Sequence, residues 1–376
     1  MKRGSKRILT THTGSLPRPM NLAEMLEASV EGNPPEPAKL AARAHSAVAE
    51  IVARQVGSRV DVVSDGEQSK VGYSTYIMDR LTGFEGKLVP SLRVDWLDFP
   101  QAAARRSLIG HRPSCNGPIE WKDMKAVQRD IFNFKEALIG VAHEEAFMTA
   151  ASPGVIAHFF ENDYFPNREA YVERLADVMK VEYDAIHAAG FLLQVDCPDL
   201  AMSRHSRFSD LSTEEFLKIV EMHVQALNHA VRDIPADRMR MHLCWGNYEG
   251  PHHLDVPLKE IIGTVLKAKP MAISFEGANP RHEHEFAVFR DVKLPDDKII
   301  MPGVVDTTTN FIEHPELVAQ RIIRYAELVG RENVIAGSDC GFSTFARTAP
   351  TIEPEIAWAT LRTLADGAEI ASSALW

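Results

Sequence analysis

The chain has 376 residues, with 41 Lys and Arg against 52 Asp and Glu, so its formal net charge at pH 7 is −11. Apolar residues make up 45% of the chain and charged residues 25%, which is typical of a folded globular protein. The acidic charge disfavours general binding to nucleic acid or to an anionic membrane, because phosphate binding needs clustered Lys and Arg. Apolar runs are too short to cross a bilayer, and four cysteines are too few for a disulfide scaffold. We therefore expect a cytoplasmic protein with small-molecule partners, no nucleic acid and no membrane.

Short apolar runs alternate with longer amphipathic segments along the chain. The first two runs, 8–13 and 60–64, are predicted strands separated by a helix over 37–55. The first strand ends in a turn rich in Gly and Pro, and the second breaks at Asp65-Gly66-Glu67. The next stretch, 68–140, is the least regular part of the chain. We interpret it as a long insertion after the second strand.

Beyond the insertion the alternation becomes regular. A capping box at Ser212–Glu215 predicts one helix start, and Pro166 is placed at the first position of a helix that ends at Gly190. Six further strands are predicted, over 146–150, 191–196, 239–244, 271–275, 299–305 and 333–337.

Eight strands in strand–helix alternation imply a parallel sheet with right-handed crossovers. The predicted fold class is α/β, a (β/α)8 TIM barrel that spans 1–376 as a single domain with 68–140 inserted in it. A doubly wound open sheet is the alternative. It usually has a Gly-rich phosphate loop after its first strand, and neither G-x-G-x-x-G nor a Walker sequence is present here.

Polar or metal-ligating side chains stand where almost every predicted strand ends. In a barrel the active site is built at the carboxyl ends of the strands, so these residues are the candidates. Asp and Ser also cap helices, and a lone buried Cys is often only a small apolar residue. Support for a functional site therefore comes from the presence of such residues at almost all strand ends together. The candidates are Ser15, Glu67, Asp196, His242, Cys244, Glu276, Asp306 and Cys340.

The segment His242-Leu243-Cys244 indicates a metal centre. Residues two apart on a strand point the same way, so the imidazole and the thiol converge. Zn²⁺ accepts Cys and His ligands, and Cys340 can close on the same point with Glu276 as a weak oxygen ligand. Other clusters are poorer candidates: His282 and its neighbours are interpreted as a solvated helix start, and His252 with the adjacent histidine as a loop.

Six motifs of the chain, in this order, resemble the catalytic C-terminal barrel of cobalamin-independent methionine synthase over nearly the whole chain. The motifs are Gly14-Ser15-Leu16-Pro17-Arg18, Asp65-Gly66-Glu67, Val195-Asp196-Cys197-Pro198, His242-Leu243-Cys244, Val304-Val305-Asp306 and Asp339-Cys340-Gly341. The N-terminal barrel of that family has no counterpart, so the chain is similar to the short, single-barrel members.

The resemblance implies roles for most of the candidates. The zinc ligands would be His242, Cys244, Glu276 and Cys340. Ser15, Glu67 and Asp196 would hold the amino-acid end of homocysteine, with the two carboxylates binding its ammonium group. The expected activity is that of a zinc-dependent thiol S-alkyltransferase, most simply methyl transfer to homocysteine or a similar amino thiol.

The chain departs from the family pattern at three places. Cys197 stands where the family has Glu, and Thr308 replaces a histidine that follows the seventh strand. After Cys340 the sequence Gly341–Phe345 replaces a Lys-Thr-Arg-like motif. The last two departures resemble short relatives that include epoxyalkane:coenzyme M transferase, so the sequence leaves the alkyl donor open.

The replacement of the family's histidine by Thr308 affects which alkyl donor the protein can use. Displacing methyl from methyltetrahydrofolate needs general-acid help, and a threonine hydroxyl is too weak an acid to give it. We therefore predict that methyltetrahydrofolate is a slow donor or none. Asp306 is our candidate catalytic residue, able to position a water.

Four alternatives stay open. Opening of an epoxide by a sulfonate thiol predicts cationic residues near the thiol's tail, whereas Glu67 and Asp196 predict an ammonium. A metal-free decarboxylase of the uroporphyrinogen type shares the fold but leaves His242, Cys244 and Cys340 unexplained. A hydrolase of the amidohydrolase kind needs H-x-H on the first strand, which is absent. A zinc-stabilised structural protein would bind no thiol. The oligomeric state, including a homo-oligomer, also stays open.

Overall fold

Eight parallel strands form one nearly closed sheet in the computed structural model, which describes residues 1–104 and 109–376. Their order in the sheet is β1-β10-β9-β8-β7-β6-β5-β2. The predicted (β/α)8 barrel is confirmed, with a strand at each of the eight expected places. The strands are β1 (Leu9–Thr10), β2 (Val62–Ser64), β5 (Glu145–Ala151), β6 (Leu192–Asp196), β7 (Met239–His242), β8 (Ala272–Phe275), β9 (Ile299–Val305) and β10 (Ile335–Ser338).

The seam between β1 and β2 is bridged by single hydrogen bonds rather than by a ladder. The Asp61 backbone N–H donates to the Thr10 carbonyl at 3.2 Å, and the Thr11 hydroxyl donates to the Val62 carbonyl at 3.3 Å. These bonds bring the two edges of the sheet together. They also place the turns that follow β1 and β2 side by side, where Leu16 N–H donates to the Gly66 carbonyl at 3.1 Å.

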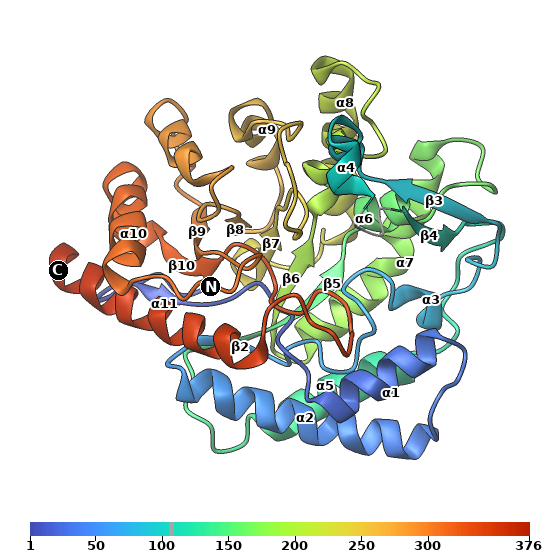
Figure 1. Ribbon diagram of the computed structural model, residues 1–376, viewed down its shortest axis with the longest axis horizontal. Helices are drawn as coiled ribbons and strands as arrows, with labels where there is room; N and C mark the ends of the chain where they lie inside the picture. Colours follow the sequence, from blue (N-terminus) through green and yellow to red (C-terminus); the bar gives the residue numbers. More distant parts are fainter. Residues whose placement is uncertain (105–108) are drawn as a thin grey trace.

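Helices surround the strands (Figure 1). The capping box of α8 is present as predicted, with Ser212 as its N-cap. The predicted start of α7 is wrong, because the side chain of Asn167 caps that helix and Pro166 precedes the cap. The α-helices outside the insertion are α1 (Met20–Val30), α2 (Pro37–Gly57), α6 (Pro153–Phe159), α7 (Arg168–Ala188), α8 (Thr213–Ala230), α9 (Leu258–Val265), α10 (Pro315–Val329) and α11 (Pro354–Leu375).

The insertion carries an antiparallel hairpin that stands outside the ring of strands (Figure 1). Its elements are α3 (Ile77–Arg80), β3 (Leu88–Leu92), η1 (Val94–Asp98), α4 (Pro100–Ala103), β4 (Ile109–Pro113) and α5 (Lys125–Ala137). Residues 105–108 of the predicted insertion lie outside the described part. Short 3-10 helices complete the chain: η2 (Pro198–Leu200), η3 (Met202–His205), η4 (Ala236–Arg238), η5 (Glu283–Arg290) and η6 (Arg331–Asn333).

The barrel interior changes character along the strands. Buried apolar residues at the strand starts, such as Leu9, Ile299 and Ile335, form a cluster on which Met1 packs. Further along, Arg240 is fully buried and donates to the Thr11 hydroxyl at 2.7 Å. The interior of the barrel is therefore more polar toward the carboxyl ends of the strands, where the cavity lies. Within the residues described, no helix combines the length and apolar character that crossing a membrane requires.

Candidate functional site

A cavity of about 540 Å³ opens at the carboxyl ends of the strands. Of the eight residues expected there from the sequence, six line it: Ser15, Glu67, Asp196, His242, Cys244 and Cys340. Glu276 and Asp306 are not among its lining residues. The structure thus brings together residues from the ends of β1, β2, β6, β7 and β10.

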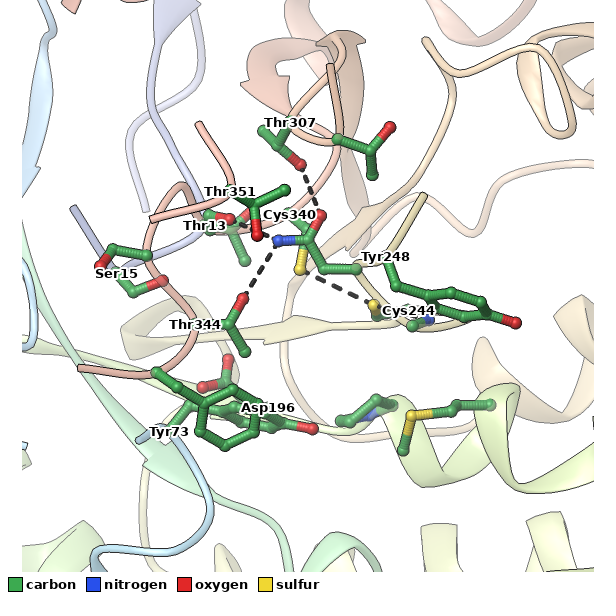
Figure 2. A pocket seen from close by; sticks show the side chains of 18 of the residues that line it. Thr13, Ser15, Tyr73, Asp196, Cys244, Tyr248, Thr307, Cys340, Thr344 and Thr351 are labelled. Atoms are coloured by element: carbon green, nitrogen blue, oxygen red, sulfur yellow. Dashed lines mark hydrogen bonds between the residues drawn. The ribbon is translucent and has the colours of Figure 1, made fainter. Parts of the chain in front are cut away.

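His242, Cys244 and Cys340 form a compact cluster in this cavity. Their ligand atoms all lie within 4.8 Å of one another, and no other such group of three or more occurs in the described part of the chain. The sulfurs of Cys244 and Cys340 face each other at 3.7 Å (Figure 2). These three side chains could hold one metal ion.

The strand pattern explains why these side chains converge. β7 ends at His242, yet the backbone N–H of Leu243 still donates to the Ser274 carbonyl at 2.8 Å. The alternation of the strand is therefore continued, so His242 and Cys244 share one face while Leu243 packs into the apolar core.

The electrostatics of the cluster fit a metal ion. Burial lowers the pKa of His242 to about 3, so its imidazole is neutral and keeps a lone pair. Nδ1 of His242 is 3.2 Å from the Ser274 hydroxyl, while its buried Nε2 has no hydrogen-bond partner among the residues described. Contact with Cys340, followed by burial, raises the pKa of the Cys244 thiol well above its usual value. A soft cation would satisfy the orphaned nitrogen and both sulfurs, and one nitrogen with two sulfurs is a donor set typical of Zn²⁺.

Glu276 lies behind this cluster. Its Oε1 accepts from the Trp245 backbone N–H at 2.7 Å and its Oε2 accepts from the Asn279 amide at 2.7 Å. Burial, and next the charge of Cys244, raises the pKa of Glu276 well above its usual value. These two hydrogen bonds orient the Glu276 carboxylate next to Cys244, whose pKa it lowers through a side-chain contact.

Two carboxylates face each other on another side of the cavity. Oε1 of Glu67 accepts from the Thr149 hydroxyl at 2.8 Å, and the buried Oε2 has no partner in the described ranges. Asp196 accepts from the Gln194 amide at 2.7 Å. Burial, and next the charge of Glu67, raises the pKa of Asp196 to about 8. The charges of Lys70 and Arg240 act in the opposite direction on the pKa of Asp196, but neither carboxylate has an ion pair within 4.0 Å in the described ranges. An ammonium group would supply that direct partner.

Ser15 lies in close contact with the turn that follows β10. A Cβ added at Gly341 would lie 2.0 Å from the Ser15 hydroxyl oxygen, so a larger residue there would displace the Ser15 side chain. Phe342 N–H donates to the Ser15 carbonyl at 2.9 Å. Arg18 donates to the carbonyls of Ser343 at 2.9 Å and Glu67 at 2.8 Å. The turns after β1, β2 and β10 are thereby held as one unit.

Asp306 is engaged in shaping its own turn. Its Oδ1 accepts from the backbone N–H and hydroxyl of Thr308 at 3.0 and 2.8 Å, and its Oδ2 accepts from Thr309 at 2.8 Å. Thr307 and Thr308 line the cavity in its place. The contacts of Asp306 hold these threonines and leave it away from the cavity surface.

A second polar cluster, missed by the sequence analysis, lies behind Trp245. Asp255 is 2.8 Å from Nδ1 of His252 and 3.0 Å from Nε2 of His282. Nδ1 of His282 is 2.8 Å from Glu285. The interpretation of His282 as solvated is wrong, because it is buried and stacks on the Trp245 ring at 4.1 Å between centroids. The i,i+3 spacings of His252 with Asp255 and of His282 with Glu285 were the available signal.

The sequence analysis also missed the outer wall of the cavity. Tyr73, Arg93 and Arg112 from the insertion line it, as does the segment 341–352 after β10. Asn247 ties two parts of this wall, donating to the Gly341 carbonyl at 2.7 Å and accepting from the Thr307 hydroxyl at 3.0 Å. Figure 2 shows Tyr73 beside Asp196, and Tyr248 on the side of Cys244.

Comparison with known proteins gives one family. Residues 146–357, more than half of the chain, match the family model described as the catalytic domain of cobalamin-independent synthase. A methionine synthase of Saccharolobus solfataricus is 25% identical over 366 residues, which cover 96% of this chain and 94% of that protein. A methionine synthase of Pyrococcus furiosus is 26% identical over 346 residues, covering 90% and 87%.

The same architecture occurs in a solved structure. A B12-independent methionine synthase from Shewanella sp. W3-18-1, in complex with selenomethionine, superimposes with a TM-score of 0.76 at 20% sequence identity. The superposition covers 98% of this chain and 99% of that one. At this identity the likeness supports the barrel fold.

Proposed function

Because the chain belongs to the cobalamin-independent methionine synthase family, we propose that it is a methyltransferase that alkylates the sulfur of homocysteine or a similar amino thiol. The observation that carries this proposal is the joint presence, in one cavity, of a His-Cys-Cys cluster and a carboxylate pair. The cluster suits a sulfur atom and the pair suits an ammonium group. An amino thiol presents both.

We assign the His-Cys-Cys cluster to a zinc ion held by His242, Cys244 and Cys340, with Glu276 as the exchangeable fourth ligand. Zn²⁺ supplies acidity, because it deprotonates a thiol that coordinates it, and the thiolate is the nucleophile. Ser274 would keep the His242 ring in the orientation that leaves Nε2 free. If a thiol replaced Glu276 as the fourth ligand, the Glu276 carboxylate would still accept hydrogen bonds from the Trp245 N–H and the Asn279 amide.

The amino-acid end of the thiol would lie on the carboxylate pair. The unpartnered Oε2 of Glu67 and the Asp196 carboxylate would accept hydrogen bonds from the ammonium group, and Ser15 would contribute its hydroxyl nearby. An ionised amino group also lowers the cost of keeping both carboxylates charged. This preference for an ammonium favours homocysteine over a sulfonate thiol.

The proposal is tested with purified, zinc-loaded protein. Homocysteine, coenzyme M and glutathione are each incubated with methyltetrahydrofolate, methylcobalamin, a methyl sulfonium and an epoxide. We expect homocysteine to be alkylated, the activity to vanish with a chelator and to return with zinc. Methyltetrahydrofolate should be a slow donor or none, because Thr308 donates its hydroxyl to Asp306 and offers no acid. Alkylation of coenzyme M but not of homocysteine would favour the epoxide-opening alternative instead.

A further inference from the structure

Three arginines line the outer part of the cavity, on segments other than the barrel strands. Arg93 follows β3, Arg112 lies in β4, and Arg347 belongs to the segment after β10. None of the three has a carboxylate within 4.0 Å in the described ranges 1–104 and 109–376. Three positive charges without an ion pair in the described ranges therefore line this part of the cavity, although the protein as a whole is acidic.

Arg93 is turned toward the cavity by an aromatic ring. Its guanidinium carbon is 3.6 Å from the centroid of the Tyr248 ring. Asp95 is close by in sequence, but its Oδ2 already accepts from the Tyr248 hydroxyl and from the His252 N–H. Burial lowers the pKa of Arg93, and the nearby Tyr248, Tyr73 and Asp95 act in the opposite direction. With no ion pair in the described ranges, the charge of Arg93 is available to an anionic ligand.

Arg112 and Arg347 flank one ring. Their guanidinium carbons are 5.9 and 5.6 Å from the centroid of Phe345. Burial lowers the pKa of Arg112, and the like charge of Arg347 lowers it further. Nε of Arg112 is buried and has no partner among the residues described. Two like charges held around one ring repel each other, and an anion between them removes the repulsion.

We propose that Arg93, Arg112 and Arg347 form a subsite for an oxyanion group of the alkyl donor, a carboxylate, phosphate or sulfonate. The inference rests on the proposed function, which assigns the zinc cluster and the carboxylate pair to the thiol. A planar guanidinium matches such oxyanions through paired hydrogen bonds. The thiol's ammonium end lies on Glu67 and Asp196 at the strand ends, so the remaining arginine-lined wall faces the other substrate.

The test measures binding of an anion without any turnover. Ethane-1,2-disulfonate, a dianion with little affinity for metals, is titrated calorimetrically into the zinc-loaded protein with and without saturating homocysteine. We expect saturable binding that homocysteine does not displace and that weakens with added salt. Arg112→Ala and Arg347→Ala should each weaken it about ten-fold or more, because each removes a charged hydrogen bond. Arg362→Ala changes an exposed arginine of α11 and should bind as the unchanged protein does.

The outcomes separate the subsite from the proposed function. Absence of saturable binding, or equal binding by both variants and the control, overturns the subsite. Displacement of the disulfonate by homocysteine places the arginines around the thiol's tail and also overturns it. If the protein binds disulfonate through the arginines but does not bind homocysteine, the anion subsite stands and the assignment of the thiol fails. Circular dichroism of each variant confirms that the barrel is folded.

Discussion

His242, Cys244 and Cys340 offer one nitrogen and two sulfurs at bonding range of a single point. If they hold zinc, His242→Ala and Cys340→Ala should reduce the zinc content toward zero. The barrel should stay folded, because a core of this size does not depend on a metal. Cys115→Ala is the matched control, since Cys115 is buried but does not line the cavity. Full zinc occupancy in Cys340→Ala, measured by plasma emission, would contradict the assignment.

The carboxylate pair makes a second prediction about single residues. Glu67→Gln and Asp196→Asn each remove one charge that faces the ammonium of the thiol in a buried place. A hydrogen bond to a charged group contributes about 1.5–3 kcal/mol, so homocysteine affinity should fall about ten- to a hundred-fold. Calorimetry on zinc-loaded protein measures this. Unchanged affinity would point to a thiol without an amino group.

The link between β1 and α2 predicts how stability depends on pH. Nε2 of His12 is 2.8 Å from the Gln55 side-chain oxygen, and Gly14 N–H donates to Nδ1 at 3.1 Å, so the buried ring is neutral. Burial lowers the pKa of His12 to about 3. In the unfolded chain a histidine takes up a proton near pH 6.5, so the stability that the neutral His12 contributes is lost as pH falls from about 6.5 toward 3.

His12→Gln should make this decline shallower between pH 6.5 and pH 5. The variant takes up one proton fewer when it unfolds. The slope of its free energy of unfolding against pH is therefore smaller by at most about 1.4 kcal/mol per pH unit. Urea unfolding across that range measures it. His284→Gln, at an exposed histidine, is the control. If the unchanged protein, His12→Gln and His284→Gln all gave the same slope of stability against pH, His12 would be protonated in the folded protein.

The close approach of β9 and β10 gives a prediction at the same scale. A Cβ added at Gly303 would lie 2.5 Å from the Asp339 Cα, and backbone cannot move aside easily. Gly303→Ala should therefore destabilise the protein by about 1–3 kcal/mol. Gly263→Ala in α9 meets no atom within 4 Å and should stabilise by about 0.5–1 kcal/mol. Thermal unfolding compares the two, and equal stability of both variants would contradict the crowded geometry.

At the scale of the whole molecule, the strands and the helices α2, α7 and α8 follow from sequence because their signals are local. Strand alternation and the capping box of α8 need only neighbouring residues. The convergence of Ser15, Glu67, Asp196, His242, Cys244 and Cys340 follows as well, since a barrel brings all strand ends to one face.

The outer wall could not be predicted in this way. Arg93 and Arg112 line the cavity together with Arg347 only because the hairpin of the insertion lies at its wall, and no local periodicity encodes that position. The buried cluster around Asp255 has the same cause: its histidines come from separate loops and resemble solvated residues until the loops are packed together. Asp306 marks a strand end correctly, yet the hydroxyls of its own turn occupy its carboxylate.

X-ray absorption at the zinc edge, before and after homocysteine is added, tests the central claim most directly. The free protein should show two sulfur ligands, from Cys244 and Cys340, together with nitrogen and oxygen. Homocysteine should add a third sulfur at about 2.3 Å and remove the oxygen of Glu276. An unchanged zinc environment at saturating homocysteine, or a site already closed by four strong ligands, would contradict the account and indicate a structural metal instead.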